Sequence, residues 1–573
     1  MKKKLTITVM LVLLALSAVF VLFGCGGQTR QKPAEFVFET GTNEKNEQYY
    51  YLNRYNGNAR DVVIPGEYEG MPVKRIAVGA FKKSGARIES ITIPDTVTEI
   101  WGKTFEDMPR LTSIIVNESN PNYSTTDGNL YDKSGKTLIK YAQGKDAEEY
   151  AINKNTAVKI EEIGGLAFYG ADALKKVTVD EGVRSIGYAA FGACGNLEEI
   201  SLPLSLSSTL SALTYGSKNK VKVRIKSLSA WCGVVNKAFI GSLSGCDLYV
   251  GDELADDISI TGASKIEEGA FKGCASITSV AVDGPSEIGS GAFRDCPELK
   301  TVTIGDSVKA IDAYAFTDDF ALERVTIGSR VTEIGRGVFS GCSELKSIEI
   351  AEENANYRSI DGSVYDKETT TLLCFAGESD DFTVADDVTT IDTYAFFTNE
   401  RIRSVTLPDS VTTIDNSAFY GCVALESVNF GNGLQTIGDN AFSYCVSLKR
   451  ADLPASLTTM YRFVFQGCSS LEAVTMAPGS ITELRQNTFD GCISLRRFDI
   501  PDGVTTLWWE IFNDCVSMEE ITIPASVKHI MNDNFSGCPD SMVIKCEMKN
   551  KPDGWGYTWS GYYQVIWDYK NAT

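Results

Sequence analysis

The cysteines are the first residues to examine for chemistry, because a thiolate can attack an electrophile, bind a metal or form a disulfide. The chain has 15 of them. Many follow one rule, each lying three residues after the phenylalanine of a recurring Ala-Phe pattern: Cys194, Cys274, Cys296, Cys342, Cys422, Cys445, Cys468, Cys492, Cys515 and Cys538. Small side chains at such regular spacing predict a single column of free thiols buried in a core.

Disulfides and metal sites are less favoured interpretations of these cysteines. Parallel stacked side chains rarely reach the geometry of a disulfide. Of the scattered cysteines, Cys232 and Cys246 could form a bridge, Cys374 and Cys546 have no obvious mate, and no short Cys or His spacing suited to zinc occurs. We therefore expect no metal and no cofactor.

The single histidine and several acidic pairs are further residues that could carry chemistry. The single histidine, His529, lies between Lys528 and Ile530 at an outward strand position, which favours a solvated side chain over a triad member. Acidic pairs could hydrolyse a glycoside or hold calcium loosely, although in turns such pairs are usually solvated. They are Asp256-Asp257, Asp318-Asp319, Asp380-Asp381 and Asp386-Asp387. We expect that the chain is not an enzyme, and a carboxylate-dependent glycan hydrolase is the least favoured of the alternative functions.

These residues are all placed by an internal repeat. A marker phenylalanine recurs, mostly 22 to 24 residues from the next, at Phe81, Phe105, Phe168, Phe191, Phe271, Phe293, Phe316, Phe339, Phe396, Phe419, Phe442, Phe465, Phe489, Phe512 and Phe535. One unit cannot bury its own apolar side chains, but stacked units form a continuous core. The pattern predicts a β-rich leucine-rich-repeat solenoid of about sixteen coils of roughly 23 residues over 76–545.

One unit shows the order of positions within a coil. Leu425, Val428 and Phe430 form a strand signal, and inward positions follow at Leu434 and Ile437. Gly438, the marker pair Ala441-Phe442 and Cys445 then complete the unit. The motif L-x-x-I-x-I-P-x-x-V-x-x-I-x-x-x-A-F-x-x-C closely resembles that of the BspA-like leucine-rich repeat proteins of bacterial surfaces, over nearly all of the mature chain.

The resemblance implies further parts. It implies an N-terminal β cap over 36–75, with hairpins from Phe36 to Tyr55, and an aromatic C-terminal cap over 546–573. Two insertions that are copies of each other, 120–145 and 354–379, would be β-hairpin islands, because each carries an Asp-Gly turn signal. Members of that family are implied to bind host matrix proteins, partner bacteria or other surface ligands.

The N-terminus has the layout of an export signal. Lys2, Lys3 and Lys4 precede an apolar run over 5–23, and Leu22-Phe23-Gly24-Cys25 resembles a lipobox. We expect a signal over 1–24, lipid attachment at Cys25, and a linker over 25–35, with the mature chain membrane-anchored at the cell surface. An uncleaved apolar anchor is the alternative.

The partners and the binding surface follow from charge and from the outward positions. A formal net charge of −21 repels phosphate backbones, so nucleic acid is not expected. Binding sites favour Trp, Tyr and Arg, and the best local candidate is Arg496 and Arg497 near Trp508 and Trp509. The expected function is recognition of an extracellular protein or glycan; the alternative is a structural envelope component that binds its own kind.

Overall fold

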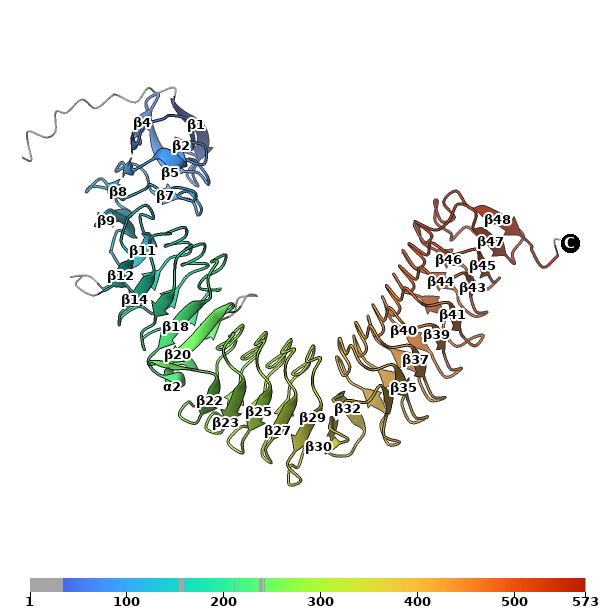
Figure 1. The fold of residues 1–573 in the computed structure, drawn as a ribbon. Helices are drawn as coiled ribbons and strands as arrows, with labels where there is room; N and C mark the ends of the chain where they lie inside the picture. Colours follow the sequence, from blue (N-terminus) through green and yellow to red (C-terminus); the bar gives the residue numbers. More distant parts are fainter. Residues whose placement is uncertain (1–34, 154–158, 211, 237–240, 242, 572–573) are drawn as a thin grey trace, which may run out of the picture. The chain divides into compact units, whose positions relative to one another are not determined.

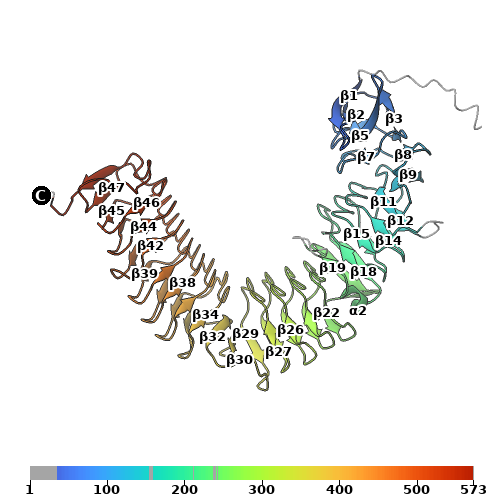
Figure 2. The ribbon, with the colours of Figure 1, turned by 180° about the vertical axis from the view of Figure 1, so that it is seen from behind.

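The computed structural model describes residues 35–153, 159–210, 212–236, 241 and 243–571. The predicted export signal over 1–24 and Cys25 lie outside these residues. The described residues form two compact units, one within 1–146 together with 166–173 and one within 147–165 together with 174–573. Each unit is a stack of coils (Figures 1 and 2).

The first unit begins with two antiparallel strands. Strand β1 (Phe36–Thr42) pairs antiparallel with β2 (Gln48–Tyr55), and Phe36 lies opposite Tyr55. The same sheet continues through β5 (Met71–Ile76), β4 (Glu67–Tyr68) and β7 (Glu99–Ile100). A second sheet, of β3 (Asp61–Val63), β6 (Ser90–Ile93) and β8 (Ser113–Val116), holds the first coils. The strands of the first island are β9 (Tyr123–Thr126), β10 (Asn129–Asp132) and β11 (Thr137–Lys140), and one short 3-10 helix is η3 (Gly85–Arg87).

In the second unit most coils contribute two strands, one to each of two sets of parallel strands. The first strand of a coil is the longer one, and these are β12 (Glu149–Ile152), β14 (Lys176–Val179), β16 (Glu199–Ser201), β18 (Val221–Ile225), β20 (Cys246–Val250), β22 (Asp257–Ile260), β23 (Ser279–Val282), β25 (Thr301–Ile304), β27 (Arg324–Ile327), β29 (Ser347–Ile350), β33 (Asp381–Thr383), β35 (Ser404–Thr406), β37 (Ser427–Asn429), β39 (Arg450–Asp452), β41 (Ala473–Thr475), β43 (Arg497–Asp499), β45 (Glu520–Ile523) and β47 (Val543–Cys546). We call their surface the long-strand face.

The second strand of a coil has two residues, and the surface formed by these strands is called the short-strand face. They are β13 (Glu162–Ile163), β15 (Ser185–Ile186), β17 (Ser208–Thr209), β19 (Val235–Asn236), β24 (Glu287–Ile288), β26 (Ala310–Ile311), β28 (Glu333–Ile334), β34 (Thr390–Ile391), β36 (Thr413–Ile414), β38 (Thr436–Ile437), β40 (Thr459–Met460), β42 (Glu483–Leu484), β44 (Thr506–Leu507) and β46 (His529–Ile530). Between β20 and β22 lies β21 (Glu253–Leu254).

The parallel pairing keeps equivalent repeat positions opposite each other. Val302 pairs with Val325 and Ile304 with Ile327, partners 23 residues apart. Within a long strand, exposed and buried residues alternate because successive side chains point to opposite faces of the sheet. The predicted leucine-rich-repeat solenoid is confirmed.

Two of the columns in the core consist of phenylalanines and cysteines. Marker phenylalanines of neighbouring coils stack nearly parallel, with ring centroids 4.5 Å apart for Phe396 and Phe419 and 5.6 Å apart for Phe442 and Phe465. The cysteine column is buried and free, as predicted. Most of its thiols donate to the carbonyl of the marker phenylalanine one coil earlier, over 3.1 to 3.3 Å: Cys296, Cys342, Cys422, Cys445, Cys468, Cys492, Cys515 and Cys538.

Cys232 and Cys246, between which a disulfide was possible, are both buried and free. One expectation about a single residue is wrong. Asp319 does not lie in a solvated turn: it occupies the cysteine position of its coil, three residues after Phe316, and is fully buried. Its Oδ1 accepts from the Cys296 amide at 2.7 Å, and burial raises the pKa of this carboxyl well above its usual range.

The two islands have the same structure. In the second, β30 (Tyr357–Ile360) pairs antiparallel with β31 (Ser363–Asp366), and β32 (Thr371–Cys374) follows. Asn354, which is buried, donates to the carbonyls of Gly328 and Val331 and accepts from the Asn356 and Tyr357 amides. In the first island Asn120 makes the four equivalent bonds.

The irregular coil near 221–250 contains the short helix α2 (Leu228–Trp231), whose first turn is capped by the Ser227 hydroxyl. The solenoid ends at β48 (Gln564–Trp567), which pairs in parallel with β47. Trp555 and Trp559 are buried beside it, with their ring centroids 4.4 Å apart. These aromatic residues pack at the end of the last coil.

Candidate ligand-binding site

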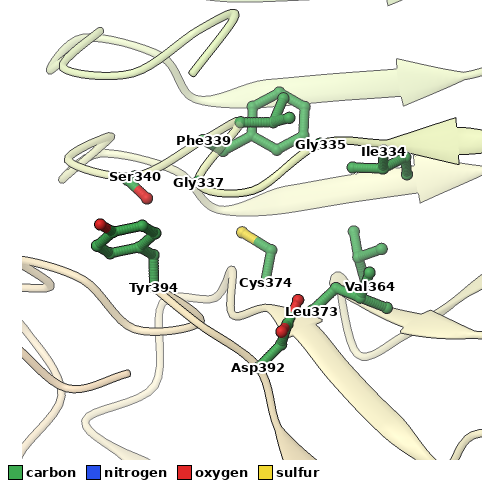
Figure 3. Close-up of a pocket in the computed structure, with 11 residues that line it drawn as sticks. Ile334, Gly335, Gly337, Phe339, Ser340, Val364, Leu373, Cys374, Asp392 and Tyr394 are labelled. Carbon is green, nitrogen blue, oxygen red and sulfur yellow. The ribbon is translucent and has the colours of Figure 1, made fainter. Parts of the chain in front are cut away.

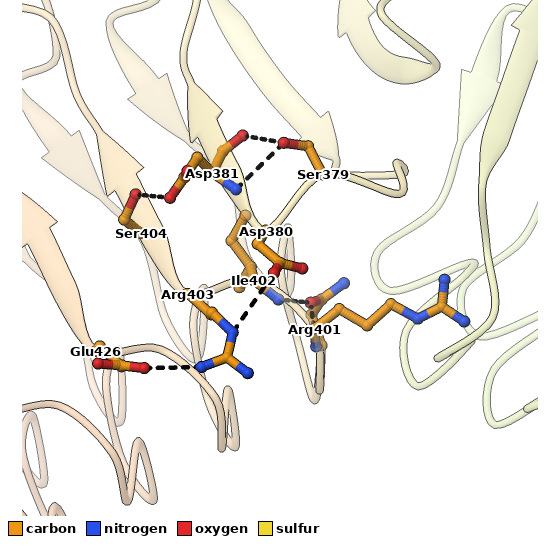
Figure 4. Close-up of polar contacts among 9 residues, drawn as sticks. Ser379, Asp380, Asp381, Arg401, Ile402, Arg403, Ser404 and Glu426 are labelled. Atoms are coloured by element: carbon orange, nitrogen blue, oxygen red, sulfur yellow. Dashed lines mark hydrogen bonds and ion pairs between the residues drawn. The ribbon is translucent and has the colours of Figure 1, made fainter.

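The acidic pair at 380–381 lies on the long-strand face and is bonded to the next coil (Figure 4). Arg403 contacts the Asp380 carboxylate at 3.5 Å and the Glu426 carboxylate at 2.9 Å, so one guanidinium links three coils. The Ser404 hydroxyl donates to Asp381. These carboxylates therefore act as links between strands.

The predicted arginine and tryptophan pairs lie on different sheets. Arg496 directly precedes β43 on the long-strand face, Arg497 begins that strand, and Arg496 forms an exposed ion pair with Glu519 at 3.2 Å. Trp508 and Trp509 directly follow β44, which belongs to the short-strand face. The structure does not bring the four residues into one site, because the chain crosses the coil between them.

The tryptophans instead line a pocket on the short-strand face. Its volume is about 400 Å³, within the range of ligand sites. Its lining comes from four successive coils: Asp439, Tyr461, Arg462, Glu483, Arg485, Gln486, Trp508 and Trp509. We call it the aromatic pocket. Arg496 and Arg497 are not among its lining residues.

The backbone ladder positions the lining side chains. Tyr461 and Trp508 each donate their amide to the inward residue of the preceding short strand, Ile437 at 2.9 Å and Leu484 at 3.0 Å. Tyr461, Arg485 and Trp508 are each the first residue after a short strand. Equivalent positions in a parallel stack lie side by side, so their side chains project from neighbouring coils to the same edge.

The charged side chains of the pocket form two ion pairs, Glu483 with Arg485 and Asp439 with Arg462. The Glu483 carboxylate accepts from the Trp508 indole at 2.6 Å and from Arg485 at 2.7 Å. The Trp508 bond and the arginine hold the pKa of Glu483 below its usual 4.5. The Arg485 guanidinium also lies over the Tyr461 ring, 4.9 Å from its centroid. The four side chains thus fix one another's orientation.

The second pair is Arg462 with Asp439. The guanidinium donates from Nε at 3.3 Å and from Nη2 at 3.2 Å to the two oxygens of the carboxylate. The pocket lining therefore contains two arginines and two carboxylates, and their formal charges cancel. Such an arrangement favours a ligand without net charge.

Sequence reasoning missed Tyr461, Arg462, Glu483 and Arg485, although a signal was present. The first position after the short strand is Asp392, Asp415 and then Gly438 in the preceding coils. It then becomes Tyr461, Arg485 and Trp508 in three successive coils. Comparing this one position from coil to coil finds the site, whereas proximity along the chain does not.

A second pocket lies between the second island and the short-strand face (Figure 3). Its volume is about 20 Å³, room for one water molecule. Burial raises the pKa of the Cys374 thiol to about 12 and raises that of the Asp392 carboxyl. A thiol this weakly acidic is a poor nucleophile. The crevice, with about 20 Å³, is also too small for a substrate.

Three further predicted features are placed as follows. His529 begins β46 with an exposed side chain. Within the described part of the chain, no group of three or more His, Cys, Asp or Glu side chains could hold a metal ion. None of the described helices has the length and apolar character needed to cross a membrane.

Comparison with known proteins identifies the repeat. The family model described as "BspA type Leucine rich repeat region (6 copies)" matches residues 58–137, 147–232, 264–375, 373–478 and 412–542. No curated protein matches the chain.

Among solved structures, a leucine-rich cell surface protein from Faecalibacterium prausnitzii is 24% identical over 82% of this chain and 94% of that chain, with a TM-score of 0.39. A leucine-rich repeat protein from Eubacterium ventriosum is also 24% identical, over 64% of this chain and 83% of that chain, with a TM-score of 0.40. The pneumococcal vaccine antigen PcpA is 15% identical over 93% and 97%, with a TM-score of 0.31.

Proposed function

Because the chain belongs to the bacterial BspA-type leucine-rich repeat family, we propose that it is a cell-surface binding protein that recognises an extracellular protein or glycan. The mature chain is held at the membrane by a lipid on Cys25, and the solenoid is displayed outside the cell. Residues 36–75 and 546–573 serve as the caps of the scaffold. The chain catalyses no reaction.

One observation carries this proposal: the aromatic pocket. A repeat scaffold needs only apolar inward residues and polar outward ones, so exposed aromatic rings are not required for folding. Trp509 is 45% exposed and Tyr461 is 38% exposed, in adjoining parts of one pocket. Partly exposed aromatic and arginine side chains grouped in a concavity are the composition of a binding site.

The test is a binding screen with the full-length chain immobilised on a surface. The panel comprises extracellular matrix proteins, bacterial cell walls and purified glycans, each at several salt concentrations. Saturable binding to any of them supports the proposal. Binding only to a second copy of the chain would favour a structural envelope component, and turnover of a glycan would favour a carboxylate-dependent hydrolase.

A further inference from the structure

We propose that the aromatic pocket binds an uncharged sugar unit of a glycan, through stacking on Trp508 and Trp509 and hydrogen bonds to its ion-paired rim. This inference rests on the proposed function and narrows it to one site and one ligand class. It follows from the ring arrangement, the charge balance and the volume of the pocket.

The rings offer a surface that fits a sugar. The Trp508 and Trp509 centroids are 5.2 Å apart and their planes meet at 48°, so together they form a shallow angle and not one flat wall. One face of a pyranose carries mostly C–H bonds, whose positive hydrogens are attracted to the negative face of an aromatic ring. Trp508 is held in place by its bond to Glu483, so little side-chain freedom is lost when a ligand binds.

The charge balance selects against ions. Arg485 is already neutralised by Glu483 and Arg462 by Asp439. An anion or a cation would have to compete with these pairs and leave one partner unmatched. Because both pairs are partly exposed, the penalty is modest, but it acts against either sign of charge. Cation binding at the Tyr461 ring is further opposed, since the Arg485 guanidinium already occupies that ring face.

The same groups suit hydroxyls. A guanidinium has five N–H donors, and Glu483 uses those on Nε and Nη2 of Arg485. Carboxylate oxygens have several acceptor sites each, so Glu483 and Asp439 can still accept from a ligand. Adjacent donors and acceptors match the paired hydroxyl groups of a sugar. A pocket of about 400 Å³ has room for one or two sugar rings.

A matched control exists in the first unit. Trp101 is the first residue after the short strand β7, and its indole donates to Glu99. The Arg75 guanidinium lies 4.8 Å from its ring centroid and is paired with Glu99. Trp101 is 37% exposed and is not among the residues that line the aromatic pocket. Replacing Trp101 therefore removes a tryptophan that makes similar contacts but lies outside the aromatic pocket.

The experiment uses the full-length chain with Trp508→Ala, Trp509→Ala and Trp101→Ala variants. The probes are neutral oligosaccharides (cellohexaose, maltohexaose, xylohexaose and mannohexaose), charged oligogalacturonate and chitosan oligomers, and a random peptide library. Calorimetry measures affinity at 50 and 500 mM NaCl. We expect at least one neutral probe to bind with little salt dependence, about tenfold or more weaker binding after either pocket substitution, and unchanged binding after Trp101→Ala.

Folding is checked by circular dichroism, and Trp509→Ala keeps the test informative if Trp508→Ala fails to fold, since Trp509 is the more exposed ring. Binding of only charged probes or peptides would overturn the inference, as would neutral-sugar binding that survives both pocket substitutions. If the chain binds a protein with the pocket variants unaffected, this inference fails while the proposed function stands. Binding of nothing in either panel overturns both.

Discussion

The indole of Trp508 donates a 2.6 Å hydrogen bond to the carboxylate of Glu483, which lies 25 residues earlier and one coil away. This bond joins a ring that can contact a ligand to the ion pair that sets the charge of the pocket. The two halves of the proposed site are therefore coupled by one side-chain contact, which makes Glu483 the most informative residue to change.

Glu483→Gln should weaken the pocket in a pH-dependent way. The substitution leaves Arg485 without its anion, so we expect hydrogen exchange of the Trp508 amide to become faster at pH 7. The native pKa of Glu483 is lowered from 4.5, so its contribution is present above that pH and is lost as the pH falls through the lowered value. The difference between the two proteins should shrink as the pH falls below 4.5, because the Glu483 carboxylate becomes protonated. A difference that does not change as the carboxyl titrates would contradict this account.

Asp319→Cys should stabilise the chain at neutral pH. The Asp319 carboxyl is buried with a raised pKa, so the folded state is penalised increasingly as the pH rises above the ordinary Asp value. Its Oδ2 has no hydrogen-bond partner among the described residues, a cost of about 1–3 kcal/mol. A cysteine would restore the column between Cys296 and Cys342. Thermal melts at pH 7 should show a higher midpoint, with the gain shrinking at pH 4.

The matched variant for that prediction is Asp319→Asn, which is nearly isosteric and cannot ionise. The difference in melting midpoint between the asparagine and cysteine variants should not depend on pH, because neither carries the carboxyl. The asparagine variant does not restore the thiol contact. Equal melting temperatures of the parent and the cysteine variant at every pH would mean that the buried Asp319 carboxyl does not destabilise the folded chain.

Asn354→Asp should loosen the second island. The side-chain nitrogen donates to two carbonyls, at 2.9 and 3.1 Å, and a carboxylate cannot donate to either. We expect a loss of about 2–4 kcal/mol in local stability, because two buried acceptors lose their donor and a charge becomes buried. Hydrogen exchange of the Tyr357 amide reports it. The same change at Asn120 should act only on the first island, and protection unchanged by either substitution would refute the anchoring role.

The thiols should be inert in the folded chain. Burial raises the pKa of Cys468, Cys538 and Cys546 to about 12, so thiolate is scarce at pH 8. Iodoacetamide followed by mass spectrometry should label the column cysteines slowly in buffer and fully in guanidinium chloride. Cys374, which is half-buried, is the expected first site of reaction. Rapid labelling of Cys468 in the folded chain would show that the coils open readily.

Cys25→Ala should abolish lipid attachment. Expression in bacteria fed a labelled fatty acid should give a labelled parent chain and an unlabelled variant, because a lipobox is acylated on its cysteine thiol. Fractionation then distinguishes the two sequence interpretations. A parent chain that stays in the membrane without any label would establish the uncleaved apolar anchor instead.

The core was predictable because it is repeated. Each marker phenylalanine and each column cysteine recurs about once per coil, so chance agreement is negligible and the buried face follows directly. Asp319 was misread because adjacent aspartates usually mark a solvated turn, and only its distance from Phe316 reveals the column position. A repeat position carries more information here than residue type.

The site was only half predictable for a geometric reason. Arg496 and Trp508 are close in sequence, but one coil carries its two strands on separate faces. Tyr461 and Trp508 are far apart in sequence and line the same pocket. In a solenoid, neighbours on a surface are separated by whole coils, so sequence proximity selects the wrong partners.

The aromatic pocket is lined by residues at equivalent positions of consecutive coils, and this affects how the binding surface can evolve. The inward residues of each unit are shared, so duplication or loss of one coil's coding segment would leave the core intact. Such a change would add or remove one coil's lining residues beside Tyr461 or Trp508. Recombination between repeats can thus change the ligand specificity of the pocket while each variant still folds.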